Sequence, residues 1–290
     1  MKDGVINILK PAGMTSNDVV YDVRRAFSIR RVGHTGTLDP GACGVLPVCL
    51  GKATKLFDYL VDKEKEYIAE LAIGTDTDTL DAYGRITGKD TRIVTAEELL
   101  KVIPEFVGEQ EQIAPMYSAV SVNGQRLYKL ARKGVEVERA PRRINVKSIE
   151  LLQSTENRFL MKIRCSKGTY VRTLCHDMAK ALGTCGYVSF LLRSASGAFT
   201  LEDSVSLAEV TEAVQNDDSD RFITPVDEVL GFMPAVRFGN EPHVWKRLIN
   251  GADIAYSCDT LVRVYYDELF VGIGECTDGR LHIKTQFCEG

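Results

Sequence analysis

The sequence lacks several features that would assign it to a common class. No apolar run is long enough to cross a membrane, and no basic stretch followed by an apolar one opens the chain, so we expect neither a membrane helix nor a signal peptide. The eight cysteines include no Cys-x-x-Cys pair and no nearby His at zinc-ligand spacing, which argues against a metal site. We interpret them as small buried hydrophobic residues of a protein in the reducing cytoplasm.

Nucleotide-binding signatures are absent as well. A P-loop requires Ser or Thr after its Gly-Lys pair, but Gly51-Lys52 is followed by Ala53, and the first glycine of the motif would fall at Leu46. There is also no Gly-x-Gly-x-x-Gly dinucleotide signature. We therefore expect no nucleotide energy source and no redox cofactor.

The composition is that of an ordinary globular protein. The 290 residues are 44% hydrophobic and 26% charged, which is enough for one large domain and a small one. Patterns of period two predict strands, and capping boxes at residues 15–18 and 95–98 predict helices, so the expected class is α+β. From about residue 232 the pattern changes to one short helix and three short strands, which predicts a smaller β-rich unit.

A polar loop followed by an apolar strand is the most informative stretch. Residues 33–40 combine glycines, hydroxyls, an imidazole and a carboxylate, and residues 44–50 read as a buried strand. Asp39 is the only acidic residue between Asp22 and Asp58. A tight loop entering a buried strand can hold one reactive side chain rigidly, but Asp-Pro also begins ordinary turns in which Asp caps the backbone. By itself the pattern favours the structural interpretation.

Basic residues are concentrated in one segment although the whole chain has a net charge of −4. Between Ser118 and Lys147, eight basic residues against two acidic ones give a local net charge of +6. The basic residues are Arg126, Lys129, Arg132, Lys133, Arg139, Arg142, Arg143 and Lys147. Such a cluster fits a phosphate-binding surface, and a solvated helix face explains it equally well.

Two further stretches bear on chemistry. Apolar residues recur at helical spacing from Val171 to Leu182, whereas Arg172, His176 and Lys180 lie four apart on another face. Arg172 therefore projects away from the core stripe, where a lone arginine is normally solvated. The acidic segment 75–84 departs from the calcium-loop pattern at several ligand positions and is expected to be a turn.

The string GHTGTLDPGACGVLPVCLGKATK closely resembles the signature of the TruB-type pseudouridine synthases. It differs from the expected form at Gly41, where a bulkier apolar residue is common, and at Cys43, where Thr is common. The resemblance implies that the protein isomerises uridine 55 in the T-loop of tRNA. The N-glycosidic bond breaks, the uracil turns, and the base rejoins the ribose through C5, so no cofactor, metal or guide RNA is expected.

The resemblance also assigns roles to individual residues. Asp39 is implied as the catalytic nucleophile and Arg172 as its partner. Tyr67 is implied to stack on the flipped-out uracil and to take part in proton transfer. Tyr170 and Leu191 match residues placed beside the target nucleotide.

The remaining implied site residues serve to bind or support RNA. His34 is expected to contact the RNA near the vacated base, and Lys10 belongs to an opening motif that supports the active-site loop. Phosphate contacts are expected from four arginines of the basic segment: Arg126, Arg132, Arg142 and Arg143. Ser121 departs from the family pattern, which often has a basic residue there.

The implied architecture is a pseudouridine-synthase fold, with a mixed, mainly antiparallel sheet flanked by helices. Residues 1–230 would form the catalytic domain and residues 231–290 a small PUA-like RNA-binding domain. We expect a cytoplasmic monomer that binds the tRNA T-arm and no membrane.

Three other functions are compatible with parts of this sequence. A non-catalytic RNA-binding or RNA-chaperone protein would use the basic segment, but it would not need Asp39, Tyr67 and Arg172 together. A guide-RNA-dependent synthase related to dyskerin would share the Asp39 loop, although the basic segment resembles the stand-alone bacterial enzymes. A glycosidase with paired carboxylates would need a second acid, and no motif places one near Asp39.

Overall fold

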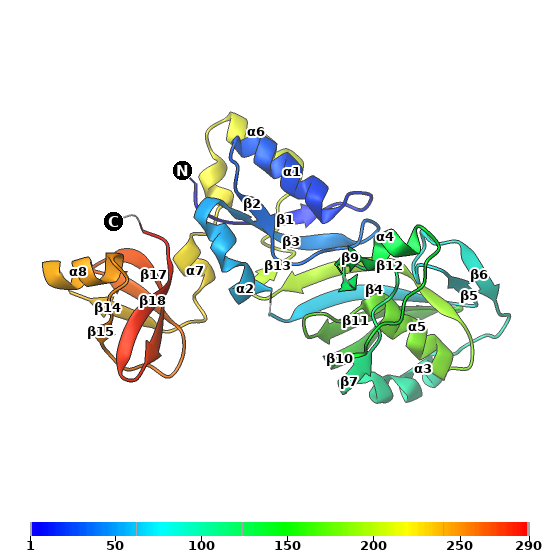
Figure 1. Ribbon diagram of the computed structural model, residues 1–290. Coiled ribbons are helices and arrows are strands. Elements are labelled where there is room, and N and C mark those ends of the chain that lie inside the picture. Colours follow the sequence, from blue (N-terminus) through cyan, green and yellow to red (C-terminus); the bar gives the residue numbers. More distant parts are fainter. Residues whose placement is uncertain (1, 62, 123, 240, 289–290) are drawn as a thin grey trace.

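One large sheet forms the centre of the computed structural model, which describes residues 2–61, 63–122, 124–239 and 241–288 (Figure 1). The strands of this sheet are β1 (Gly4–Lys10), β2 (Val32–His34), β3 (Cys43–Leu50), β4 (Lys65–Ile73), β7 (Gly108–Gln112), β10 (Arg142–Thr155), β11 (Arg158–Cys165), β12 (Gly186–Ser196) and β13 (Phe199–Thr200). Within the described residues their order is β1-β3-β12-β4-β11-β10-β7, with β2 beside β3 and β13 beside β12. Every pairing is antiparallel except that of β3 with β12. The prediction of a mixed, mainly antiparallel sheet is confirmed.

Helices cover this sheet in two groups (Figure 1). Helices α1 (Ser16–Phe27) and α6 (Leu207–Gln215) pack on β1 and β3, where buried valine, leucine and isoleucine side chains form one core cluster. Helices α3 (Ala96–Val102) and α5 (Val171–Ala181) pack on β4, β10, β11 and β12 over a second cluster. The two clusters meet at Tyr67 of β4 and Leu191 of β12, which contact both. The two core clusters therefore adjoin one another at the middle of the sheet.

The helix boundaries follow the sequence signals closely. Thr15 and Thr95 cap α1 and α3 with capping boxes completed by Asp18 and Glu98, as predicted. The basic helix predicted over residues 126–133 is shorter than expected, because α4 spans only Leu127–Ala131. The other helices are α2 (Phe57–Leu60), α7 (Val226–Val229) and α8 (Pro242–Ile249), with 3-10 turns η1 (Gly51–Leu56), η2 (Ile103–Phe106) and η3 (Ser219–Phe222). In the part of the chain that the structure describes, no helix is long and apolar enough to span a membrane.

Two hairpins project from this framework. They are β5 (Thr75–Thr77) with β6 (Ile86–Lys89), and β8 (Ser121–Val122) with β9 (Gln125–Arg126). The acidic segment 75–84, predicted as a turn, consists of β5 and most of the connection from β5 to β6. Thr79 of that connection and Tyr117, which precedes β8, both accept hydrogen bonds from Arg172.

A second sheet occupies the C-terminal part of the chain. Its strands are β14 (Ala235–Phe238), β15 (Ile254–Ala255), β16 (Val262–Tyr266), β17 (Leu269–Thr277) and β18 (Arg280–Gln286), in the order β14-β16-β17-β18-β15. Helix α8 packs on it. The sequence predicted the helix and three strands, and the structure adds the short strands β14 and β15. The expected small β-rich C-terminal part is confirmed.

The small sheet is fastened to the large one by η1 and α2. Lys52 Nζ donates to the carbonyl of Phe287 at 3.0 Å, and the hydroxyls of Tyr59 and Thr285 are 2.9 Å apart. Ile273 of β17 joins an apolar cluster with Leu56 and other buried side chains of this region. Burial of that apolar surface stabilises the arrangement of the two parts.

The interpretation of the cysteines is wrong for several of them. Cys258 and Cys276 form a disulfide, with their Cα atoms 5.5 Å apart, because the loop before β16 passes beside β17. Of the free cysteines, three are buried and three are half-buried. The buried ones are Cys49, Cys165 and Cys175; the half-buried ones are Cys43, Cys185 and Cys288.

Candidate active site

The loop between β2 and β3 carries Asp39 and is held by backbone contacts on both sides. Ser16, at the start of α1, bonds both backbone groups of Leu38, accepting from its N–H at 2.9 Å and donating to its carbonyl at 3.1 Å. The N–H of Gly13 donates to the Pro40 carbonyl at 2.8 Å. These bonds fix the backbone immediately before and after Asp39, so its carboxylate is presented by a rigid frame.

Lys10 supports the same loop from below. Its side chain is fully buried, and Nζ donates to the carbonyls of Pro11 and Met14 at 2.7 and 2.6 Å and to that of Pro40 at 3.4 Å. Burial lowers the pKa of this amine to about 8, against a smaller opposing effect of nearby Cys43 and Asp39. The structure thus places Lys10 beneath the loop as a buried support of its backbone.

Arg172 brings three separate segments together around Asp39. Its Nε donates to Asp39 Oδ2 at 2.8 Å, while Nη1 donates to the Thr79 carbonyl at 2.5 Å and Nη2 to the Tyr117 carbonyl at 2.8 Å. The arginine side chain is 4% exposed, and that of Asp39 is 33% exposed. The buried guanidinium therefore holds a carboxylate that remains open to a substrate.

Arg172 is not solvated, as a lone arginine on its face of α5 would normally be, and His176 on the same face is buried too. Arg172 and His176 are only 3% and 8% exposed. Arg172 is covered by the Asp39 loop and the two segments it bonds. His176 Nδ1 lies 3.2 Å from the Gly186 carbonyl and 3.4 Å from Asp76. Helical spacing identified the core face correctly, but it contains no information about loops that return over the other face.

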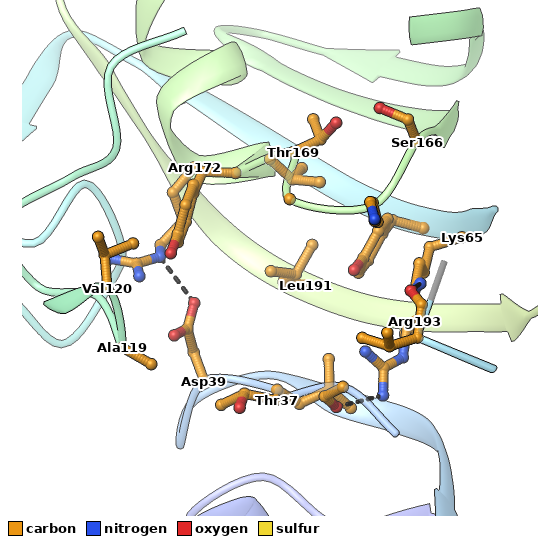
Figure 2. Close-up of a pocket in the computed structure, with 18 residues that line it drawn as sticks. Thr37, Asp39, Lys65, Ala119, Val120, Ser166, Thr169, Arg172, Leu191 and Arg193 are labelled. Atoms are coloured by element: carbon orange, nitrogen blue, oxygen red, sulfur yellow. Dashed lines mark hydrogen bonds and ion pairs between the residues drawn. The ribbon is translucent and has the colours of Figure 1, made fainter. Parts of the chain in front are cut away.

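A cleft of about 330 Å³ opens beside the Asp39–Arg172 pair (Figure 2). That volume lies in the range of small-molecule sites. Five residues predicted from the sequence line it: Asp39, Tyr67, Tyr170, Arg172 and Leu191. In Figure 2, Asp39 and Arg172 point toward one another and Leu191 lies between Arg172 and Arg193. The structure thus gathers side chains from β4, β12, α5 and the Asp39 loop.

Tyr67 and Tyr170 differ in how they are held. Tyr67 is half-buried on β4; burial raises the pKa of its hydroxyl, and the Arg193 guanidinium, which it contacts, acts in the opposite direction. Tyr170 precedes α5, and the side chain of Gln112 bonds both its backbone N–H and its carbonyl, at 2.8 and 3.0 Å. Arg142 lies over the Tyr170 ring, 5.5 Å from its centroid. A planar ring is available at each position.

The other predicted RNA-binding residues are not part of the cleft lining. His34 is half-buried; its Nδ1 accepts from the Gly36 N–H at 3.3 Å, and burial, together with the charge of Arg193, lowers the pKa of its imidazole. The side chains of Arg126, Arg132 and Arg143 are exposed, and Arg142 is half-buried. Ala119 and Val120, from the same basic segment, contribute to the cleft wall (Figure 2).

Sequence reasoning missed two charged residues of the site. Asp81 Oδ2 lies 3.7 Å from Arg172 Nη1, so a second carboxylate faces the same guanidinium. Arg193 lines the cleft, is 1% exposed, and donates to the carbonyls of Val45 and Gly36 at 2.7 and 3.1 Å. An arginine inside an alternating strand was the available signal for Arg193, because a buried charge requires specific partners.

We expect Arg193 to be essential for the stability of the site. Arg193→Gln should lower the free energy of unfolding by about 3 kcal/mol, because it leaves buried carbonyls without a donor. Urea denaturation measures this change. Arg158→Gln is the matched control: that arginine is 51% exposed and pairs with Glu70 on the surface, so its loss should cost less than about 1 kcal/mol. Equal midpoints for the two variants would contradict the assignment.

Among the described residues, no group of three or more His, Cys, Asp or Glu side chains is arranged to hold a metal ion. The functional groups that line the cleft include instead one carboxylate, two guanidinium groups, two lysine ammonium groups and two phenol rings. This set can bind an uncharged planar ring and an adjacent anion, with one carboxylate free to react.

Two solved structures share the fold of this chain. The chain superposes on one described as "Crystal Structure of a Cbf5-Nop10-Gar1 Complex" with a TM-score of 0.76 and 25% identity, covering 99% of this chain and 85% of that one. A second, described as "Structure of H/ACA RNP bound to a substrate RNA containing 2'-deoxyuridine", gives a TM-score of 0.74 at 24% identity, covering 98% and 85%. The fold is therefore that of the pseudouridine synthases.

The family follows from the sequence comparisons. Residues 24–171 match the model "TruB family pseudouridylate synthase (N terminal domain)", and residues 172–231 match "tRNA pseudouridylate synthase B C-terminal domain". The tRNA pseudouridine synthase B of Alkaliphilus oremlandii is 42% identical over 94% of this chain and 92% of its own length. That of Caldanaerobacter subterraneus is also 42% identical, over 98% and 99%. The chain belongs to the TruB family of pseudouridylate synthases, as its Asp39 motif predicted.

Proposed function

We propose that this protein converts uridine 55 in the T-loop of tRNA to pseudouridine, with Asp39 as nucleophile and without guide RNA or cofactor. The relatives of about 42% identity carry the name tRNA pseudouridine synthase B. The observation that best supports the proposal is the pairing of a buried Arg172 with a partly exposed Asp39 at 2.8 Å. A guanidinium at that distance favours the ionised carboxylate, which is the nucleophilic form.

The reaction is balanced without any co-reactant. The bond from N1 of uracil to C1′ of the ribose breaks, the freed base turns, and a bond forms from C5 to C1′. The proton that leaves C5 is matched by one gained at N1. In our proposal Asp39 forms a transient covalent bond with the flipped-out nucleotide, Tyr67 stacks on the uracil, and Leu191 packs against it. The cleft of about 330 Å³ provides room for one nucleoside.

Residues around the cleft would bind the rest of the T-arm. We assign the exposed arginines Arg126, Arg132 and Arg143 to the phosphates of the stem, because they belong to the segment with a net charge of +6. Arg142 and Tyr170 would act together beside the target nucleotide, and His34 at the position that the base vacates. Lys10, fully buried, would act only through the loop it supports.

The C-terminal part would bind tRNA outside the active site. We propose residues 1–230 as the catalytic domain and residues 231–290 as a PUA-like RNA-binding domain. A surface hollow of about 480 Å³ in the second part is lined by His243, Arg247 and Arg280, and also by the acidic Asp253 and Asp278. We propose that the protein acts on tRNA in the cytoplasm, as a monomer.

Tritium release tests the proposal directly. The purified protein is mixed with a T-arm stem-loop labelled at C5 of uridine, without guide RNA or added metal. We expect release approaching one tritium per uridine 55, and none above background from a stem-loop that carries cytidine at position 55. Binding without release would favour an RNA chaperone, and release only after addition of guide RNA would favour a dyskerin-like enzyme.

A further inference from the structure

Tyr83 is an exposed aromatic residue that rests on the catalytic loop. It lies in the connection between β5 and β6 and is 69% exposed. A Cβ atom on Gly41 would lie 2.0 Å from Cε2 and 2.5 Å from Cδ2 of the Tyr83 ring. The ring therefore occupies the space that any other residue at position 41 would fill, two residues after Asp39.

Glycine at position 41 is explained by this space and not by backbone conformation. Its φ lies outside the left-handed region, where glycine is favoured, in contrast to Gly36 and Gly44 on either side. Many members of the family are expected to have a bulkier residue here, as noted from the sequence. Gly41 and Tyr83 form a complementary pair in this chain.

The backbone that carries Tyr83 is fixed by hydrogen bonds that lead to Arg172, the partner of Asp39. Asp81 Oδ1 accepts from the Tyr83 N–H at 3.0 Å and from the Thr79 hydroxyl at 2.6 Å. The Thr79 carbonyl in turn accepts from Arg172, and the N–H of Val188 donates to the Leu80 carbonyl at 3.1 Å. These bonds fix the backbone around Tyr83, and its ring lies against Gly41 of the Asp39 loop while most of the side chain remains in water.

Tyr83 stands at the edge of the site. A small recess, lined by Tyr83 and Gly41 together with Asp39, Arg172 and Leu191, adjoins the main cleft and shares the last three residues with it. A nucleotide that enters the cleft leaves its neighbours in the strand without a stacking partner. An aromatic ring beside the cleft can replace that partner, and the entropic cost is reduced because the backbone that carries the ring is already fixed.

We propose that Tyr83 is a substrate-positioning residue whose exposed ring stacks on a base adjacent to the target uridine. This inference rests on the proposed function, because it assigns the occupant of the surface as single-stranded RNA. Stacking of one base on an aromatic side chain contributes about 1–3 kcal/mol, which corresponds to roughly 5- to 150-fold in affinity.

Steady-state tritium release from the T-arm stem-loop tests the role of the ring. Tyr83→Ala should raise KM about 10-fold and lower kcat by less than about threefold, because stacking acts on bound RNA before and during the reaction. Tyr83→Phe keeps the ring and should retain the wild-type KM. Tyr21→Ala is the matched control: Tyr21 is 61% exposed on α1, and its removal should leave both constants unchanged.

The pairing with Gly41 provides a second test. Gly41→Leu should displace the ring and raise KM as Tyr83→Ala does, whereas the double variant should be no worse than Tyr83→Ala alone, because the leucine then has room. Additive effects would overturn the pairing. A Tyr83→Ala variant with wild-type KM would overturn the proposal, as would one that loses only kcat, since that result would mean the ring merely supports the catalytic loop.

A failure of the Tyr83 proposal can be distinguished from a failure of the proposed function. If the wild-type protein releases no tritium from the stem-loop, the assigned reaction is wrong. If the wild-type protein is active and Tyr83→Ala matches it in KM, only the role of Tyr83 is wrong.

Discussion

Asp39→Asn is expected to reduce tritium release by about 10⁴-fold or more, while the affinity for T-arm RNA changes by less than about threefold. The amide is nearly the same size as the carboxylate and keeps an oxygen that accepts from Arg172, so the loop should retain its geometry. It is not a nucleophile, and the covalent step is therefore lost. Single-turnover tritium release and filter binding measure the two quantities.

The control for this variant is Asp58→Asn. Asp58 is an exposed acid in α2, outside the cleft lining, and its amide variant should be indistinguishable from the wild type in both assays. Residual release above about 1% of the wild-type rate would exclude Asp39 as the essential nucleophile. A more than 10-fold loss of RNA affinity, or loss of folding, would instead indicate that Asp39 is mainly structural.

Arg172→Met should lower the rate of tritium release by about 10³-fold and the free energy of unfolding by about 3 kcal/mol. The guanidinium donates to Asp39, Thr79 and Tyr117, which belong to three separate loops. Its removal leaves a carboxylate and two carbonyls without their donor and frees the loops to move. Arg172→Lys should fall between the wild type and Arg172→Met, because one ammonium cannot serve three acceptors in the same directions.

Urea denaturation and single-turnover release measure both effects. Arg164→Met is the control, because Arg164 is 57% exposed and its contact with Glu66 is long, at 3.8 Å. Such surface pairs contribute about 0–1 kcal/mol. If Arg172→Met matched Arg164→Met in both measurements, the ion pair with Asp39 would contribute neither to the rate of tritium release nor to the free energy of unfolding.

Local signals predicted much of the fold. Capping boxes at Thr15 and Thr95 and alternation along β4, β10, β11 and β12 identified elements that the structure contains. These signals are reliable because each depends on residues only a few positions apart. The disulfide between Cys258 and Cys276 left no such signal, since the approach of its two segments is a property of the small sheet.

Only some of the site residues could be predicted from the sequence, because the others depend on contacts between distant segments. Asp39, Tyr67 and Leu191 lie in recognisable motifs, and all three line the cleft. Asp81 lies in a segment that the sequence identified only as an acidic turn, and its relation to Arg172 appears only when the β5–β6 connection folds over α5.

The sequence by itself determined the family and the class of fold and indicated Asp39, with Arg172 as its partner, for the chemistry, because these depend on ordered motifs and on local periodicity. Only the tertiary structure decided that Arg172 is buried beneath segments distant in the chain, that Arg193 is enclosed between β3 and the loop, and that Tyr83 rests on Gly41. Contacts between distant segments depend on how the whole chain packs, and a charged or aromatic residue that looks solvated in its own element becomes part of a site when another segment covers it.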